Sequence, residues 1–273
     1  MRFGIHLPQY GKSAGPDAIV RAARHAEALG FDDVWVSDHI VHPAEQDYPS
    51  PFLYDPLLTL CWAAAATERI GIGTSVLIPA HHAALEMANS LASLDALSKG
   101  RLVIGIGTGW SAREFAALGQ SFSDRGRRTD QIIDMWRACW SDDPVDFDGS
   151  FYRLDQIRVL PKPAQRIPIW VGGRTEPAYR RAIERGDGFQ AIGLDPNDAA
   201  TTVARIRRDK PDPSFTISLR TGWDPRGMDP GLIRDERAGY AAAGIQHVVA
   251  APWRNDLDAW LRSMEELASL VII

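Results

Sequence analysis

The chain has 273 residues, of which 45% are hydrophobic and 24% are charged, so it is long enough to bury a sizeable core. This composition excludes a disordered chain, a collagen-like repeat and a small disulfide-stapled domain. The 30 Lys and Arg residues and the 35 Asp and Glu residues give a net charge of -5. No segment is basic enough to follow a phosphate backbone, and we therefore expect no nucleic-acid partner.

The cysteines and the apolar segments predict the compartment. Cys61 and Cys139 are the only cysteines, and each lies in an apolar, helix-like stretch, which favours two reduced thiols in the core. The apolar run Phe3–Leu7 has the wrong length and flanks for a signal peptide, and no segment reaches the ~18 apolar residues of a membrane span. We expect a cytoplasmic protein that does not enter a membrane.

Short apolar runs alternate with longer amphipathic segments along the chain. The short runs are rich in Val and Ile, which is typical of parallel strands buried on both faces. Eight strands are predicted in this way, at Phe3–Leu7, Asp33–Val36, Ile70–Ile78, Arg101–Ile106, Ile167–Val171, Gly188–Ile192, Thr216–Leu219 and Gln246–Ala250.

The amphipathic segments have helix start and stop signals. The first begins at Pro16 and Asp17 and stops at Gly30, a residue that accepts the left-handed conformation of a helix end. The other predicted helices are Ala83–Ser98, Arg127–Trp140, Pro177–Arg185, Pro196–Arg208, Pro230–Ala243 and Asp256–Leu270.

Eight strands that alternate with helices over about 250 residues match the size of a (β/α)₈ TIM barrel. A doubly wound sheet is the alternative, although its usual strand count is nearer six. One connection is unusual: Val145–Arg158, between the fourth and fifth strands, alternates like a small hairpin with Asp148-Gly149 as its turn. We interpret this hairpin as an insertion, and expect residues 1–273 to form a single α/β barrel domain.

Catalytic groups of such barrels lie at the C-terminal ends of the strands. Applied to the predicted strands, this rule selects segments that are rich in glycine and polar side chains: His6-Leu7-Pro8-Gln9, Ser37-Asp38-His39, Gly73-Thr74-Ser75-Val76, Gly105-Ile106-Gly107-Thr108-Gly109-Trp110, Gly172-Gly173-Arg174, Arg220-Thr221-Gly222-Trp223 and Pro252-Trp253-Arg254. His39 is the candidate acid or base, because a histidine beside a carboxylate exchanges protons near neutral pH. In isolation, an Asp-His pair is more often structural, but its position at the C-terminal rim favours a catalytic role.

Other chemistries are less well supported by the residues. Gly172-Gly173-Arg174 precedes a predicted helix and would suit an anion, although it also fits an ordinary tight turn. A phosphate fingerprint at Gly105–Gly109 lacks the GxGxxG spacing. We expect no metal, since the chain has no HExxH and no HxH after the first strand, and no GxSxG or Cys-His pair indicates a nucleophile.

Several segments, in the same order along the chain, resemble the luciferase-like monooxygenase superfamily. They are Phe3-Gly4-Ile5-His6-Leu7-Pro8-Gln9, Ala26–Asp32, Trp35-Val36-Ser37-Asp38-His39, Ala65–Thr74, Ala92–Arg101, Ile167–Gly173 and Ala242–His247. Within the superfamily they look most like the branch that uses coenzyme F-420, a deazaflavin. The resemblance implies a barrel with a flavin or deazaflavin at its C-terminal rim.

The resemblance also implies roles for individual residues. Asp38 would contact the deazaflavin ring and His39 would act as acid or base at its reactive face. A non-proline cis peptide at Ser75-Val76 would press against the back of the ring. Gly107-Thr108-Gly109 and Gly172-Gly173 match backbone segments next to the cofactor, the second of them near its phosphate. Thr74 and Arg174 are also expected to bind the cofactor, with Arg174 adding a charge-assisted contact to an anion. The protein would transfer a hydride between F-420 and a small organic substrate.

One position departs from the family pattern. Deazaflavin-dependent sugar-phosphate dehydrogenases have a glutamate directly after Gly-Thr-Gly, where this chain has Trp110. A tryptophan cannot donate a proton, which argues against a sugar-phosphate substrate. We expect His6, Trp110, Trp223 and Trp253 to contact substrate, although packing or a dimer contact would also explain the tryptophans.

Two other functions fit the resemblance: an FMN-dependent monooxygenase that receives reduced flavin from a partner reductase, and a member that binds cofactor without turnover. The resemblance also implies a homodimer. The apolar stretches Leu57–Ala66 and Leu267–Ile273 are candidate dimer faces, or else helix surfaces packed on the barrel.

Overall fold

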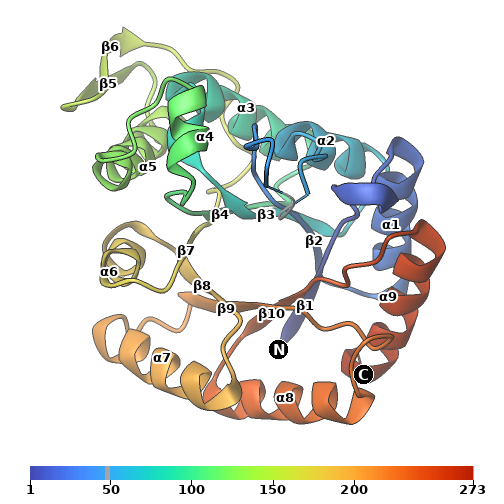
Figure 1. The fold of residues 1–273 in the computed structure, drawn as a ribbon. Helices are drawn as coiled ribbons and strands as arrows, with labels where there is room; N and C mark the ends of the chain where they lie inside the picture. Colours follow the sequence, from blue (N-terminus) through green and yellow to red (C-terminus); the bar gives the residue numbers. More distant parts are fainter. Residues whose placement is uncertain (47–49, 273) are drawn as a thin grey trace.

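A closed barrel of parallel strands forms the centre of the protein in the computed structural model, which describes residues 1–46 and 50–272 (Figure 1). Around the barrel the strands follow the order β1-β10-β9-β8-β7-β4-β3-β2. They are β1 Arg2–His6, β2 Asp33–Val36, β3 Gly71–Leu77, β4 Leu102–Ile106, β7 Ile169–Gly172, β8 Gly188–Ile192, β9 Thr216–Thr221 and β10 His247–Ala250. The predicted (β/α)₈ barrel is confirmed.

Helices surround the barrel and connect its strands (Figure 1). They are α1 Pro16–Leu29, α2 Pro56–Ala65, α3 Ala84–Leu97, α4 Ala112–Ala117, α5 Arg125–Ser141, α6 Glu176–Arg185, α7 Pro196–Asp209, α8 Pro230–Ala243 and α9 Leu257–Val271, with short 3₁₀ turns at Gly11–Ser13 and Pro79–His81. None of these helices is long and apolar enough to cross a membrane.

The sequence analysis gave no limits for the helices α2 and α4. In the structure, each begins with a side chain that caps its first turn. Asp55 accepts a hydrogen bond from the Leu58 amide at the start of α2. Ser111 accepts one from the Glu114 amide at the start of α4. Helix α4 has only six residues, so its hydrophobic period is too short to detect.

The predicted hairpin is present between β4 and β7, as β5 Val145–Asp148 and β6 Arg153–Ile157. Its predicted turn at Asp148-Gly149 is wrong. Asp148 pairs with Arg153 inside the antiparallel ladder, and the Gly149 amide donates to the Tyr152 carbonyl, so the connection spans residues 149–152. Four connecting residues replace the two-residue turn expected from an Asp-Gly pair.

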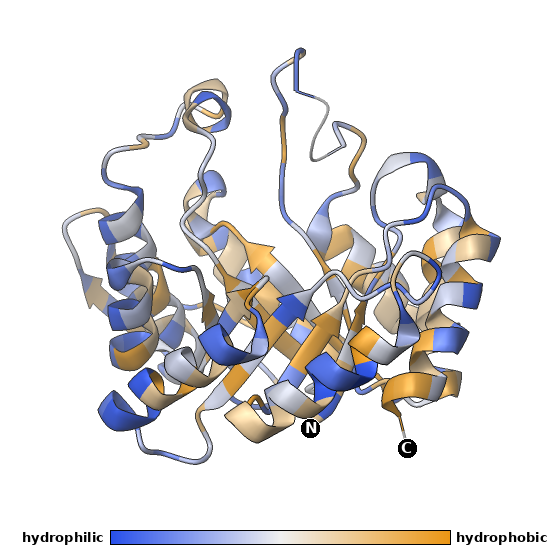
Figure 2. Cartoon of the chain, turned by 60° about the horizontal axis from the view of Figure 1, so that its bottom comes forward, coloured by the Kyte–Doolittle hydropathy of each residue, from blue (hydrophilic) through white to orange (hydrophobic). Residues whose placement is uncertain are grey.

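The hydrophobic residues concentrate on the strands and on the inner helix faces (Figure 2). Toward the N-terminal ends of the strands, the barrel interior is filled by stacked Trp35 and Trp170, whose ring centroids are 5.3 Å apart. Gly73 makes room for this layer, because a Cβ there would lie 2.6 Å from Trp35. His247 lies beside both rings, 2.9 Å from Asp33 Oδ1. This end of the barrel is therefore packed.

One expectation about packing is corrected by the structure. Cys139 is buried but Cys61 is exposed on α2, so only one of the two free thiols lies in the core. In the stretch Leu267–Ile273, Leu267 and Val271 are buried, which agrees with the interpretation of this stretch as a helix surface packed on the barrel; Ile273 lies outside the described residues.

Candidate active site

Two adjoining cavities lie at the C-terminal ends of the strands. The large cavity has a volume of about 990 Å³ and the small cavity about 530 Å³. Most of the predicted site residues line the large cavity: Asp38, His39, Ser75, Val76, Gly107, Thr108, Gly109, Trp110, Gly172, Gly173 and Arg174. Trp110 and Trp253 line the small cavity. The residues shared by the two cavities are Ser37, His39, Trp110, Ile192 and Arg220, which we call the junction.

Three predicted site residues line neither cavity. Trp223 is fully buried: its indole N–H donates to Glu236 at 2.7 Å and its ring stacks on Tyr240 of α8. Thr74 is buried and its hydroxyl donates to the Gly105 carbonyl inside the barrel. His6 is fully buried, and its ring contacts those of Tyr10 and Trp253, which line the small cavity. Position at a strand end did not determine which way these side chains point.

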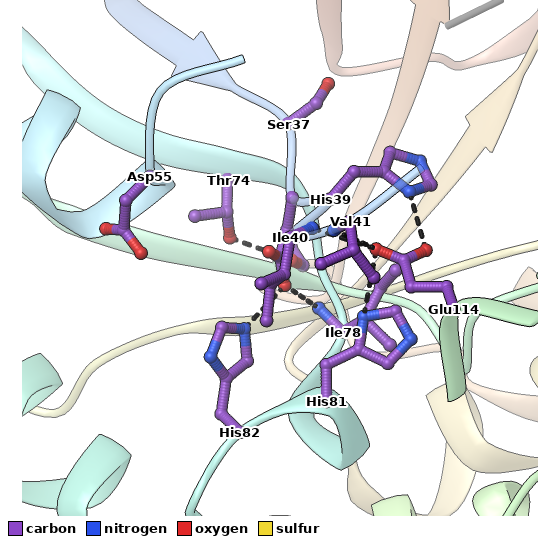
Figure 3. Close-up of polar contacts among 12 residues, drawn as sticks. Ser37, His39, Ile40, Val41, Asp55, Thr74, Ile78, His81, His82 and Glu114 are labelled. Atoms are coloured by element: carbon purple, nitrogen blue, oxygen red, sulfur yellow. Dashed lines mark hydrogen bonds and ion pairs between the residues drawn. The ribbon is translucent and has the colours of Figure 1, made fainter. Parts of the chain in front are cut away.

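A buried carboxylate supports His39. Glu114 Oε2 lies 2.9 Å from His39 Nδ1, and its Oε1 accepts a hydrogen bond of 2.8 Å from the Ile40 amide (Figure 3). Burial alone would raise the pKa of Glu114, but the His39 hydrogen bond and the Ile40 amide together lower it. Glu114 is therefore a carboxylate at neutral pH, and it can stabilise a positive charge on His39.

Glu114 was missed by the sequence analysis, although a signal for it exists. Ser111 and Glu114 have the Ser-x-x-Glu spacing of a capping box, which marks the start of a helix directly after the fourth strand. The serine caps the helix as expected. The glutamate does not turn back to the cap but reaches across to the segment after β2.

His81 lies on the other side of Glu114. Its side chain is fully buried, and its Nδ1 lies 3.8 Å from Glu114 Oε1 (Figure 3). Its ring packs edge-on against Phe115, with centroids 4.4 Å apart. Burial lowers the pKa of His81, so the ring is neutral at neutral pH and does not compete with His39 for the charge of Glu114.

Asp38 lines the large cavity, and one of its side-chain oxygens has no hydrogen-bond partner in the described part of the chain. Its Oδ2 accepts a hydrogen bond from the Ile78 amide at 2.8 Å and lies 2.8 Å from His82 Nε2. Its Oδ1 is buried and has no hydrogen-bond partner among the described residues. Burial lowers the pKa of His82, but the Asp38 hydrogen bond outweighs it and the net effect raises that pKa. A ligand N–H or O–H would satisfy the remaining oxygen of Asp38.

Val76 lies between two glycines on the wall of the large cavity. A Cβ at Gly107 would come within 2.7 Å of Val76 Cγ2, and a Cβ at Gly172 within 2.9 Å of Val76 Cγ1. Side chains at these two positions would displace the valine. The Ser75-Val76 peptide is cis, as the resemblance implied. The arrangement gives the cavity an apolar wall that suits the face of a planar ring.

A chain of polar contacts fixes Arg220, a junction residue that the sequence analysis placed at the rim without giving it a role. Its guanidinium donates to the Ser75 carbonyl and, at 3.2 Å, to Ser37 Oγ. Ser37 Oγ is 3.0 Å from His6 Nε2, and the other ring nitrogen of His6 contacts the Leu7 carbonyl. Burial and the charge of Arg220 place the pKa of His6 well below its usual value, so His6 is a neutral acceptor for Ser37.

Arginines gather at the outer end of the large cavity. Arg125, Arg127, Arg174 and Arg180 line it, and none of the four forms an ion pair with a carboxylate within residues 1–46 and 50–272. Arg125 donates to the Gly109 carbonyl at 3.1 Å. Arg181, which also lines the cavity, is paired with Asp130. The surplus of positive charge would attract an anionic ligand.

A family model described as luciferase-like monooxygenase matches residues 1–226, which is most of the chain. The chain belongs to the luciferase-like monooxygenase family. An F-420-dependent glucose-6-phosphate dehydrogenase from Amycolatopsis mediterranei is 32% identical to this family member over 182 residues, covering 64% of the chain. The match covers 53% of that relative, so the chain spans about half the length of the relative it matches.

Solved structures share the fold of this luciferase-like protein over its whole length. An F-420-dependent secondary alcohol dehydrogenase, in complex with an F-420–acetone adduct, aligns over 100% of both chains with a TM-score of 0.82 and 20% identity. The monooxygenase RslO1 from Streptomyces bottropensis aligns over 100% of this chain and 99% of its own, with a TM-score of 0.79 and 21% identity. At these identities, the likeness shows the fold alone.

Among the described residues, no group of three or more His, Cys, Asp or Glu side chains is arranged to hold a metal ion. His39 and His42 have ring centroids 5.3 Å apart, but no third ligand completes a site there in the described part of the chain.

Proposed function

We propose that this protein is an oxidoreductase that transfers a hydride between coenzyme F-420 and a small organic substrate. The observation that carries this proposal is the position of His39. It is supported by the buried Glu114 carboxylate, and it lies at the junction of a cavity large enough for a cofactor and a smaller one for a substrate. One imidazole thus reaches both ligands.

The large cavity fits a deazaflavin in three places. The Val76 wall offers apolar contact to a planar ring, and the unpartnered Asp38 Oδ1 offers an acceptor to a ring N–H or O–H. Gly172 and Gly173 bring backbone to the cavity wall just before α6, where a phosphate would find free amides. When bound, the deazaflavin would supply the two-electron, hydride-transferring chemistry.

The arginines favour F-420 over FMN. FMN ends in a single phosphate, whereas the tail of F-420 carries a phosphate followed by carboxylates. Arg125, Arg127, Arg174 and Arg180 provide more positive charge than one phosphate requires. The F-420-dependent relative supports the same choice.

His39 would accept or donate the proton that accompanies the hydride. In the direction of oxidation, the substrate hydroxyl gives its proton to His39, and the Glu114 carboxylate stabilises the resulting imidazolium. In the reverse direction, the imidazolium returns the proton to the substrate oxygen. Arg220, held by Ser37 and Ser75 at the junction, keeps a fixed positive charge close to the reacting groups.

An anaerobic titration tests the cofactor assignment. The protein is titrated with F-420 and with FMN while the absorbance spectra are recorded. We expect F-420 to bind more tightly by at least tenfold. Tight binding of FMN with no binding of F-420 would instead establish the flavin monooxygenase, which needs a separate reductase.

We also propose that the protein is a homodimer that associates through α2. Leu58 and Trp62 lie one helical turn apart on this helix and are 71% and 54% exposed. Apolar side chains exposed side by side on one helix are typical of an interface.

A further inference from the structure

The walls of the small cavity are mainly apolar and aromatic. Tyr10, Leu53, Trp110 and Trp253 line it, and the rings of Tyr10 and Trp253 lie 4.9 Å apart. Trp110 and Trp253 are 58% and 41% exposed, which is high for the largest apolar side chain. Both rings thus offer uncovered surface to a ligand beside His39, whose ring lies 5.8 Å from that of Trp110.

The polar side chains of the small cavity are His39, Arg220 and the hydroxyl groups of Tyr10, Ser37 and Thr221. Among its described lining residues, Arg220 is the one permanently cationic side chain, and there is no carboxylate. Arg220 already donates to Ser75 and Ser37, and its guanidinium carbon lies 5.4 Å from the centre of the Trp253 ring. Four arginines that form no ion pair with a carboxylate among the described residues, Arg125, Arg127, Arg174 and Arg180, line the large cavity instead.

These features do not suit a sugar phosphate. A phosphate dianion is held by several charge-assisted donors, and a sugar needs a partner for each hydroxyl group that leaves water. Tryptophan and leucine walls provide neither. A flat or branched apolar body would instead cover the exposed ring surfaces.

We propose that the small cavity binds a neutral substrate with an apolar or aromatic body and one alcohol or carbonyl oxygen, which lies toward His39. This inference rests on the proposed function for its chemistry. In the oxidation, the carbinol C–H bond breaks and its electron pair leaves as hydride to the oxidised deazaflavin. The hydroxyl proton goes to His39, and the C–O single bond becomes a carbonyl.

Binding measurements test the substrate class without relying on turnover. Acetophenone and glucose 6-phosphate are titrated by calorimetry into the protein with and without saturating F-420. The variant Trp253→Leu removes one wall, and Leu97→Ala, at the exposed end of α3, is the control. We expect acetophenone to bind, Trp253→Leu to weaken its binding at least tenfold, and Leu97→Ala to change its binding less than twofold. The dissociation constant of F-420 should stay within twofold in both variants.

The outcomes separate this inference from the proposed function. The inference is overturned if acetophenone does not bind, or if glucose 6-phosphate binds and displaces it. If F-420 fails to bind while acetophenone still binds in a Trp253-dependent way, the substrate class stands and the proposed cofactor is wrong.

Discussion

Glu114 and His39 are separated by 75 residues in the chain, and their side chains meet at 2.9 Å behind the junction of the two cavities. The carboxylate is almost completely buried, whereas the imidazole retains 13% exposure on the cavity side. The Glu114 carboxylate can therefore stabilise a positive charge from the buried side of the His39 ring, while the ring exchanges a proton on the side that faces the cavity. The first prediction concerns this pair.

The variant Glu114→Gln keeps the shape of the side chain and removes its charge. A hydrogen bond to a charged group contributes ~1.5–3 kcal/mol, so the rate of hydride transfer should fall by about 10- to 100-fold. Anaerobic stopped-flow measurements of F-420 absorbance over a pH series report this rate. The dissociation constant of F-420 should not change. Glu86→Gln, at an exposed position on α3, is the control, and an identical pH–rate profile for both variants would refute the role of Glu114.

The contact between His82 and Asp38 makes stability depend on pH. The pKa of His82 is raised in the folded protein above its usual value of about 6.5. Its stabilising effect is therefore fully present below about pH 6.5 and is lost as the pH rises through the folded-state pKa. The melting temperature of the wild type should exceed that of His82→Gln most at pH 5.5 and least at pH 9. A difference that grows with pH would contradict this prediction.

The close contact of Val76 with Gly107 predicts that a substitution at position 76 restores the stability lost by one at position 107. In Gly107→Ala the new Cβ would lie 2.7 Å from Val76 Cγ2, and overpacking of this kind costs about 1–3 kcal/mol of unfolding free energy. A second substitution in the same chain, Val76→Ala, removes both methyl groups of the valine, including Cγ2. The nearest remaining atom of residue 76 is then its Cβ, 3.7 Å from the new Cβ at position 107. The double variant should regain most of the stability in urea unfolding. If the two effects simply add, Val76 is not the residue that requires a glycine at position 107.

The arginines of the large cavity should discriminate between cofactor tails. Arg127→Gln and Arg180→Gln change two exposed side chains. We expect each variant to weaken F-420 binding by about threefold to tenfold at low salt and to weaken FMN binding less. The difference between the two losses of affinity should shrink in 0.5 M salt, because salt screens the charges. Fluorescence titration measures both constants, with Arg234→Gln on α8 as the control. Equal losses for the two cofactors would show that the tail does not reach these arginines.

The exposed face of α2 should determine the oligomeric state. Trp62→Glu places a charge on this face, and analytical ultracentrifugation should show a shift from dimer to monomer. Circular dichroism should show unchanged secondary structure. A wild-type protein that sediments as a monomer would exclude the proposed dimer.

Much of the fold was predictable because the strands are buried on both faces and read as short Val- and Ile-rich runs, as at Ile104 and Val171. The rule of the C-terminal rim then placed Asp38 and His39 at the cavity, since it depends only on where a strand ends. The rule does not tell which way a side chain points. Thr221 ends β9 and lines the small cavity, whereas Trp223, two residues later, packs against α8.

Two contributors to the site depend on tertiary contacts that no local pattern reports. Glu114 belongs to a one-turn helix, and its partner lies in another segment of the chain. Arg220 lies two residues after the inward-facing Ser218 of β9, so the period of two could have indicated that it points into the barrel. Its contact with Ser75 required the closed barrel, which brings β9 and β3 together across the interior.

The packed layer of Trp35, Trp170 and His247 fills the end of the barrel opposite the two cavities. The groups that hold the fold together and the groups that meet ligands are thus separated along the barrel axis. Mutations in the rim loops around Leu53, Trp110 or Trp253 can alter the choice of substrate without disturbing that layer. The protein is accordingly a scaffold on which directed evolution can exchange loops while the supporting core stays constant.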